Sequence, residues 1–207
     1  MNAYPLDAEK VKKIKCFVLD MDGTIYLGKT LFPFTPKFLQ DAHDSGREVY
    51  FFTNNSSQNA RRYIEKLAGM NITVAPDHML ISNAVIIEYL LAEHAGKTVY
   101  VVGTPALVDD FRSAGIPLND EAPDIVVLGF DTTLTYEKLH KACDFIRGGC
   151  IYYGVNPDFN CPIEGGAFLP DCGSIARLIE GSTGRTPEFF GKPSRRTFEF
   201  IVRKTGF

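Results

Sequence analysis

The 207-residue sequence has no apolar run long enough to span a membrane, since the longest candidate, Ala84 to Ala92, is interrupted by Glu88. The N-terminal stretch carries lysines between Lys10 and Lys15 and lacks the apolar core of a signal peptide. A basic stripe is also missing, and the net charge of -3 gives no reason to expect a nucleic-acid partner. These absences favour a cytoplasmic protein without a membrane or nucleic-acid partner.

The cysteines form neither a C-x-x-C pair nor an even set, which favours reduced thiols over disulfides or a zinc site. Cys161 and Cys172 lie in loop-like sequence, and either is a candidate reactive thiol, although no histidine is nearby. The five cysteines are Cys16, Cys143, Cys150, Cys161 and Cys172.

The composition is that of an ordinary soluble globular enzyme. Hydrophobic residues make up 45% and charged residues 23% of the chain. A chain of this length buries a substantial core and fits one large domain or two modest ones.

The stretch 17–24 contains the first candidate site. Three apolar residues, 17–19, predict a short strand buried on both faces, as central strands of parallel sheets are. Asp20 and Asp22 follow, and Gly23 permits a sharp turn, so both carboxylates are expected at the strand's carboxyl end, where open α/β sheets bind ligands. Two adjacent carboxylates indicate a bound cation, a shared proton, or a division of roles between nucleophile and acid.

This stretch has two other interpretations. A calcium-binding EF-hand loop starting at Asp20 would need Gly and Glu where the chain has Ile25 and Leu31, so it is excluded. A strand that ends in a solvated, Asp-rich turn remains the simpler alternative for an isolated D-x-D-G.

A second buried strand, 49–52, runs into five small polar residues. A helix is predicted to follow them directly and to reach about Ala68, so that its N-terminal amides face the same sheet edge as Asp20. Hydroxyls, amides and a helix N-terminus at one strand end make an anion site, although a simple N-cap cluster is the alternative. The five residues are Thr53, Asn54, Asn55, Ser56 and Ser57.

The rest of the chain alternates strands and helices, which predicts βαβ units with parallel pairing, possibly in a separate sheet. The segment 156–171 is predicted to be a loop, because prolines and glycines break any periodicity. Capping residues and apolar patterns place the strands at 79–81, 98–102, 125–128 and 150–155 and the helices at 36–45, 82–94, 105–113, 135–147, 174–180 and 194–204.

Lys192 lies at a predicted strand-to-helix junction, where it could meet the same anion as the polar cluster. A solvated surface charge is the alternative for a single lysine.

Three motifs in order carry a resemblance to a known family. The motifs 20–24, 53–55 and 191–193 occur in the order and approximate spacing of the haloacid dehalogenase (HAD) superfamily, and the chain is most similar to its class IIA branch, the NagD-like phosphatases. The resemblance implies a Rossmann-like core with a parallel sheet, at 1–82 and 174–207. It also implies an inserted α/β cap of the C2 type, at 83–173, which closes over the site.

The resemblance also implies roles for individual residues. Asp20 would be the nucleophile that becomes an aspartyl phosphate, and Asp22 the general acid and base. Mg²⁺ would bind the side chain of Asp20 and the backbone carbonyl of Asp22. The expected phosphate ligands are Thr53, Asn54, Asn55 and Lys192. Asn156 and Asp158 are candidates for contact with the leaving group, with a turn-forming Asn-Pro-Asp as the alternative.

The implied function is Mg²⁺-dependent hydrolysis of a small phosphorylated metabolite: a nucleotide, phosphoglycolate, a sugar phosphate or p-nitrophenyl phosphate. A phosphate-binding or regulatory protein with little turnover is the main alternative, and a phosphotransferase is a third.

The family's fourth motif, a Gly-Asp that supplies further metal carboxylates, does not follow Lys192 before Phe207. This indicates a C-terminally truncated phosphatase. Expected consequences are weak Mg²⁺ binding and an open apolar edge on the first strand, which could pair with another copy in a homo-oligomer.

Overall fold

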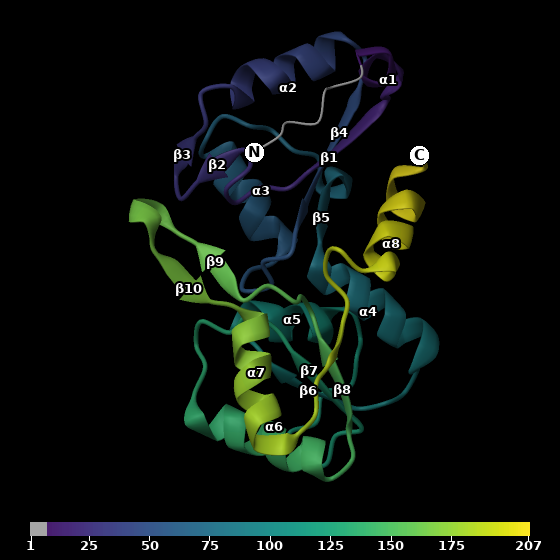
Figure 1. Cartoon of the computed structure of the whole chain (residues 1–207). Helices are drawn as coiled ribbons and strands as arrows, with labels where there is room; N and C mark the ends of the chain where they lie inside the picture. Colours follow the sequence, from purple (N-terminus) through teal and green to yellow (C-terminus); the bar gives the residue numbers. More distant parts are fainter. Residues whose placement is uncertain (1–7) are drawn as a thin grey trace.

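The computed structural model describes residues 8–207. They contain two main β-sheets, each built of parallel strands, with one sheet in each half of the molecule and helices around them (Figure 1). The α/β architecture predicted from the sequence is confirmed. The first sheet has the order β1-β4-β5, with strands Cys16–Leu19, Glu48–Thr53 and Met79–Ile81. The second has the order β11-β8-β7-β6, with strands Glu188–Phe189, Ile151–Gly154, Ile125–Leu128 and Val99–Val102.

Most helices begin and end close to the predicted positions. Thr104, Thr135 and Ser194 each accept a hydrogen bond from a backbone amide in the first turn, as expected of N-caps. Within residues 8–207, none of the helices has the length and apolar character needed to cross a membrane. The helices are α1 (Ala8–Lys13), α2 (Thr35–Asp44), α3 (Ala60–Ala68), α4 (Ser82–Glu93), α5 (Pro105–Ser113), α6 (Tyr136–Arg147), α7 (Cys172–Thr183) and α8 (Arg195–Thr205).

One hydrophobic cluster joins the two sheets. It contains Phe52 and Leu80 from the first sheet, Val101 and Val127 from the second, and buried side chains of α4, α5 and α8. Separate clusters fill the opposite face of each sheet. The shared cluster fixes the carboxyl edges of the two sheets toward each other, so residues that follow strands of both sheets can meet.

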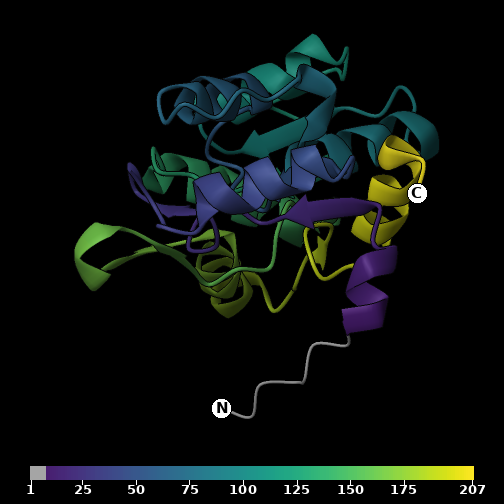
Figure 2. The ribbon, with the colours of Figure 1, turned by 90° about the horizontal axis from the view of Figure 1, so that it is seen from above.

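The segment 156–171 is not the loop that the sequence predicts. It contains an antiparallel hairpin of β9 (Asn160–Pro162) and β10 (Phe168–Pro170), with a short 3-10 turn, η2 (Glu164–Gly166), at its tip. Figure 2 shows the hairpin projecting at one side of the molecule, opposite α8. Strands of three residues flanked by proline and glycine give too short a pattern to recognise.

Helix α7 also begins earlier than predicted. Asp171, not Ser174, is its N-cap, and the Ser174 hydroxyl donates to the carbonyl of Phe159 instead. The helix therefore starts directly after β10.

The sequence predicts that strand β1 is buried on both faces, but the structure shows it only partly buried. Within residues 8–207 it pairs only with β4, and its other edge is open, so Val18 is 39% exposed. Pairing on one side leaves the strand's side chains only partly covered.

Segment 174–189 lies with the second sheet, because α7 packs against α6 and β11 pairs with β8. We propose that the inserted unit runs from 83 to 189, and that the first unit comprises 8–82 and 190–207. Residues 1–7 of the predicted core lie outside the described residues.

Candidate active site

The acidic pair Asp20 and Asp22 lies in a tight turn at the carboxyl end of β1. Gly23 has a φ of 81°, which favours glycine, and its amide donates to the carbonyl of Tyr26 at 2.8 Å. The amides of Thr24 and Ile25 both donate to the carbonyl of Met21 at 3.0 Å. The turn thus holds Asp20 and Asp22 at the sheet edge, as the sequence predicts.

Asp20 meets Lys192 across the site. The Lys192 ammonium lies 2.8 Å from Oδ1 of Asp20, and the Thr24 hydroxyl lies 3.4 Å from Oδ2. The ammonium also donates to the carbonyl of Phe52 at 3.3 Å. Lys192 is therefore directed into the site and is not the solvated surface charge of the alternative interpretation. The Asp20 side chain is 45% exposed, so it remains accessible to a ligand.

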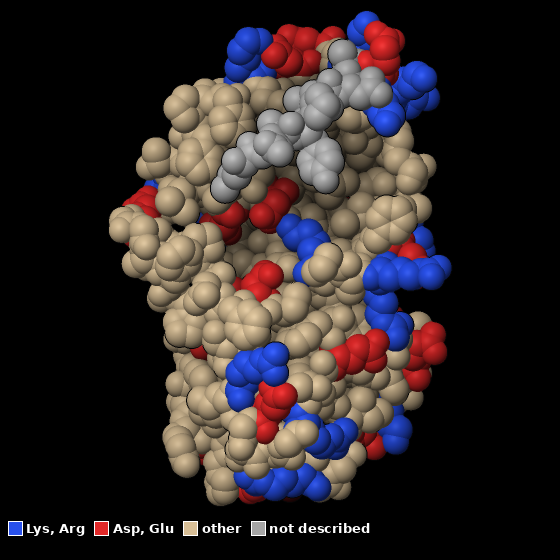
Figure 3. Space-filling view, viewed as in Figure 1, with Lys and Arg blue, Asp and Glu red and all other residues tan. Residues whose placement is uncertain are grey.

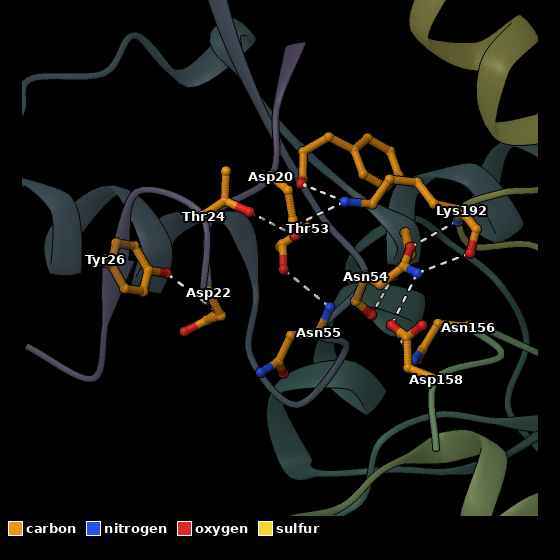
Figure 4. Close-up of polar contacts among 12 residues, drawn as sticks. Asp20, Asp22, Thr24, Tyr26, Thr53, Asn54, Asn55, Asn156, Asp158 and Lys192 are labelled. Atoms are coloured by element: carbon orange, nitrogen blue, oxygen red, sulfur yellow. Dashed lines mark hydrogen bonds and ion pairs between the residues drawn. The ribbon is translucent and has the colours of Figure 1, made fainter. Parts of the chain in front are cut away.

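Asp22 points away from this ion pair (Figure 4). Its Oδ1 lies 3.3 Å from the Lys66 ammonium, and its Oδ2 accepts from the Tyr26 hydroxyl at 3.3 Å. The Lys66 ammonium also lies 4.0 Å from the centroid of the Tyr26 ring, a cation–π contact. The two carboxylates consequently have different cationic partners, which fits different roles for them.

The polar run after β4 lies at the same edge. Thr53 is 2% exposed and its hydroxyl accepts from the Asn55 amide at 3.1 Å, with Thr53 placed between Asp20 and Asn55 in Figure 4. The Asn55 side chain accepts from the Ser57 amide and hydroxyl. These bonds form a loop in place of the first helical turn.

The sequence predicts that a helix follows the polar run directly, and this prediction is wrong. Helix α3 begins at Ala60, where the Asn59 side chain caps the helix by accepting from the Arg62 amide at 3.0 Å. The donors near Asp20 belong to the loop 53–58 and not to the helix N-terminus.

Asn54 holds the backbone of Lys192. Its Oδ1 accepts from the Lys192 amide at 2.8 Å, and its Nδ2 donates to the Lys192 carbonyl at 3.0 Å. A Cβ on Gly191 would lie 2.7 Å from Asn54 Oδ1 and 2.9 Å from the Cα of Asn156, so this approach requires glycine. The Asn54 amide is thus occupied with protein partners.

Asn156 and Asp158 extend the same network from the second sheet. Asn54 donates to Asp158 at 3.0 Å, and Asn156 donates to Asp171 at 3.0 Å and accepts from the Ser56 hydroxyl at 3.2 Å. Burial raises the pKa of Asp171 to about 6, although the hydrogen bond from Asn156 opposes this rise. Asn156 is fully buried, so its contacts are with the protein.

The β9–β10 hairpin reaches over the site from the second sheet. The Glu164 carboxylate at its tip accepts from the Lys29 amide at 2.8 Å, in the turn between β2 (Tyr26–Leu27) and β3 (Thr30–Leu31). Cys161 in the same hairpin accepts from the Asn55 side chain at 3.5 Å. Segments from both sheets therefore enclose the acidic pair.

The two candidate reactive thiols are buried. Cys161 is 8% exposed and Cys172 is fully buried, and burial raises the pKa of each thiol to about 12. A thiol kept protonated is a poor nucleophile, which argues against the reactive-thiol interpretation. The cysteines described, all five of the chain, are free, as predicted.

Acidic and basic side chains gather in the hollow between the two halves of the molecule (Figure 3). For Mg²⁺, the site offers the Asp20 carboxylate and the Asp22 backbone carbonyl, both oxygen donors of the kind that this cation prefers. Residues 8–207 contain no group of three or more His, Cys, Asp or Glu side chains that could hold an ion by themselves. This donor set fits an ion that retains waters and binds a substrate oxygen.

Two contacts of Asp22 were not predicted from the sequence. Tyr26 follows in the same turn, and Lys66 comes from α3, four residues after Arg62. The spacing of Arg62 and Lys66 places both on one helix face, but nothing in the sequence relates that face to Asp22.

The comparisons with known proteins agree with this site. Residues 17–117 match the model of the haloacid dehalogenase-like hydrolases. An acid sugar phosphatase of Staphylococcus aureus (strain MRSA252) is 35% identical over 184 residues, which cover 88% of this chain and 71% of that protein. The chain belongs to the haloacid dehalogenase-like hydrolase family.

Solved structures specify which kind of hydrolase the chain is. A 4-nitrophenylphosphatase from Thermotoga maritima superposes with a TM-score of 0.90 at 42% identity, over 95% of this chain and 75% of that one. A glycerol phosphate phosphatase from Mycobacterium tuberculosis, solved in complex with magnesium, gives 0.86 at 27% identity, over 94% and 59%. The predicted phosphatase branch and cap-bearing fold are thereby confirmed, and the chain is a hydrolase of phosphomonoesters.

Proposed function

We propose that the chain hydrolyses small phosphomonoesters through an aspartyl phosphate on Asp20. The observation that carries this proposal is the 2.8 Å contact between the carboxylate of Asp20 and the ammonium of Lys192. A carboxylate beside a fixed cation at an accessible sheet edge can receive a phosphoryl group while the cation offsets the phosphate's charge. The substrate class is a small phosphorylated metabolite, in keeping with the sugar, glycerol and nitrophenyl phosphatases among the relatives.

In the first step, an Asp20 oxygen attacks phosphorus and the bond to the ester oxygen breaks. The departing alcohol takes a proton from Asp22. In the second step, Asp22 removes a proton from water, the hydroxide oxygen attacks phosphorus, and the bond to Asp20 breaks to give inorganic phosphate. Asp20 and Asp22 return to their starting states.

The surrounding residues bind and position. Thr53 and Lys192 hold the phosphate oxygens, and Lys192 offsets the charge that develops on them. Asn54 acts through Lys192, because both polar atoms of its side chain bond to the lysine backbone. Asn55, Asn156 and Asp158 shape the loop and the wall of the site.

Mg²⁺ would be held by the side chain of Asp20 and the backbone carbonyl of Asp22, and when bound it neutralises charge on the phosphate. The inserted unit, 83–189, would exclude water from this centre.

Trapping the intermediate tests the proposal. Acid quenching during turnover of p-nitrophenyl phosphate, followed by peptide mass spectrometry, should find one phosphoryl group on the peptide that contains Asp20. Turnover without any such adduct, or an adduct on another peptide, would exclude Asp20 as the nucleophile.

A further inference from the structure

The tip of the β9–β10 hairpin lies against the turn that joins β2 to β3 (Figure 1). The Glu164 carboxylate accepts from the Lys29 amide at 2.8 Å. A Cβ on Gly28 would lie 2.0 Å from Oε1 of Glu164, so the glutamate side chain packs directly on the glycine backbone. Gly28 has a φ of 59°, which favours glycine. The turn therefore offers the carboxylate a backbone surface that no side chain covers.

The same hairpin covers the acidic turn and the polar loop of the active site. Pro162 lies over the acidic turn, since its Cγ would be 3.9 Å from a Cβ added to Gly23. The Cys161 thiol accepts from the Asn55 side chain at 3.5 Å and is 8% exposed. The hairpin thus forms one wall of the site, and its position decides how far the acidic turn and the polar loop are open to solvent.

The rest of the inserted unit is held to the first sheet by buried contacts. The Ser56 hydroxyl accepts from the Phe130 amide at 2.7 Å, and the Thr104 hydroxyl donates to the Ser57 carbonyl at 2.9 Å. Both bonds are buried, and one hydrophobic cluster joins the same two sheets. Movement of the whole unit would break both bonds and expose apolar surface, and both changes are unfavourable.

The hairpin tip, in contrast, is attached through exposed contacts. Glu164 and Lys29 are exposed, as is every residue of β10. Gly165 and Gly166 follow Glu164 with φ values of 78° and 76°, and no atom of residues 8–207 lies within 4 Å of a Cβ added to either. Segments with few buried contacts open at the lowest free energy. The hairpin should therefore open while the rest of the unit stays in place.

We propose that the β9–β10 hairpin is the gate of the active site and that Glu164 is its latch, a positioning residue that holds the hairpin closed through the Gly28–Lys29 turn. Substrate enters and product leaves when this contact opens. The proposal rests on the proposed function for what passes the gate, but the opening itself is measurable without turnover.

The Cys161 thiol reports the position of the hairpin, because it is buried in the closed form. Labelling with iodoacetamide, followed by peptide mass spectrometry, gives the rate at each cysteine. Glu164→Ala should raise the rate at Cys161 by about fivefold, since an exposed hydrogen bond to a carboxylate is lost. Cys143, buried in α6, should keep its native rate. Glu164→Gln keeps an acceptor for the Lys29 amide, so its Cys161 rate should stay within about twofold of the native one.

Gly28 offers an independent variant. Gly28→Ala should also raise Cys161 labelling, because the added methyl group would overlap the Glu164 carboxylate. Combined with Glu164→Ala it should add little, because both changes break the same contact. Gly46→Ala is the matched control: its φ is 67°, and no atom of the described chain lies within 4 Å of the added Cβ. It introduces the backbone strain without the overlap and should change Cys161 labelling by less than about twofold.

Hydrogen exchange at the Phe130 amide distinguishes opening of the hairpin from movement of the whole unit. This amide donates to Ser56 of the first sheet's loop, so its exchange accelerates when the two sheets separate. Its rate should be the same in the native chain and in Glu164→Ala.

Steady-state kinetics connects the latch to the reaction. Glu164→Ala should raise KM for p-nitrophenyl phosphate by about fivefold and leave kcat within about threefold, because the latch closes over bound substrate without touching the reacting atoms. Glu164→Gln should restore the native KM.

A native rate of Cys161 labelling in Glu164→Ala would overturn the latch. Faster labelling of Cys143 as well, or faster exchange at Phe130, would also overturn it, because the variant would then loosen the whole unit. An unchanged KM beside faster Cys161 labelling would show that the hairpin does not control access. If the native chain hydrolyses no phosphomonoester, the proposed function fails, and the labelling experiment alone decides the latch.

Discussion

The ammonium of Lys192 lies 2.8 Å from a carboxylate oxygen of Asp20, although 172 positions separate the two residues in the chain. Lys192 reaches this position from the segment that leaves the second sheet, whereas Asp20 ends the first strand of the other sheet. The ion pair therefore depends on the packing of both sheets.

Lys192→Met should lower kcat/KM for p-nitrophenyl phosphate by about a hundredfold, the usual effect of removing one donor that stabilises developing charge. Steady-state kinetics measures the effect. Lys37→Met is a suitable control, because this lysine is 79% exposed on α2 and pairs with Asp41. Equal activity of the two variants would exclude Lys192 from the reaction.

Gly191→Ala should destabilise the fold by about 1–3 kcal/mol, because the new methyl group would overlap Asn54 and the backbone of Asn156. The same shift should reduce activity by displacing Lys192. Gly181→Ala in α7 is the matched control, since no atom lies within 4 Å of its added Cβ. That variant should be more stable by roughly 0.5–1 kcal/mol, and urea unfolding measures both. A Gly191→Ala chain as stable as the control would disprove the close packing.

The pH dependence of stability should include a contribution from Asp171. Its pKa is about 6 in the folded protein against an ordinary 3.8, so the folded chain holds the proton more tightly. This contribution is complete below pH 3.8 and is lost as the pH rises through 6, by about 3 kcal/mol in total. Asp171→Asn, which keeps the acceptor for Cys172 and Asn156, should remove this loss and be more stable than the native chain at pH 7.

Thermal unfolding between pH 4 and pH 7 measures this difference. The control is Asp120→Asn, because this carboxylate is 73% exposed and removal of its charge tests for a general effect. Parallel curves for the native chain and Asp171→Asn would show that burial does not shift this group.

Much of the fold follows from local patterns. Thr104, Thr135 and Ser194 mark helix starts because a hydroxyl beside a free amide is a short-range interaction. The contacts of the β9–β10 hairpin depend on residues far away: Glu164 bonds to Lys29, 135 positions earlier. Such strands lack a periodic pattern of their own, so the segment resembles a loop in sequence.

The candidate site, like the fold, could be predicted from the sequence only in part. The position of Asp20 at a sheet edge could be predicted, because ligand sites form where parallel strands end. The meeting of Lys192 with Asp20 was expected only from the resemblance in motif order, since Lys192 follows a strand of the other sheet. The contacts of Asn54 could not, since they depend on the backbone approach that Gly191 permits. The cation beside Asp22, Lys66, comes from a helix whose start the sequence placed too early.

The most direct test of the central claim is the hydrolysis of p-nitrophenyl phosphate by this 207-residue chain with and without Mg²⁺, in the native form and as Asp20→Asn. We expect turnover that requires Mg²⁺ and falls by at least about a thousandfold in the variant, as for loss of a nucleophile. Turnover that persists in Asp20→Asn, or a correctly folded native chain with no turnover in Mg²⁺, would contradict the account.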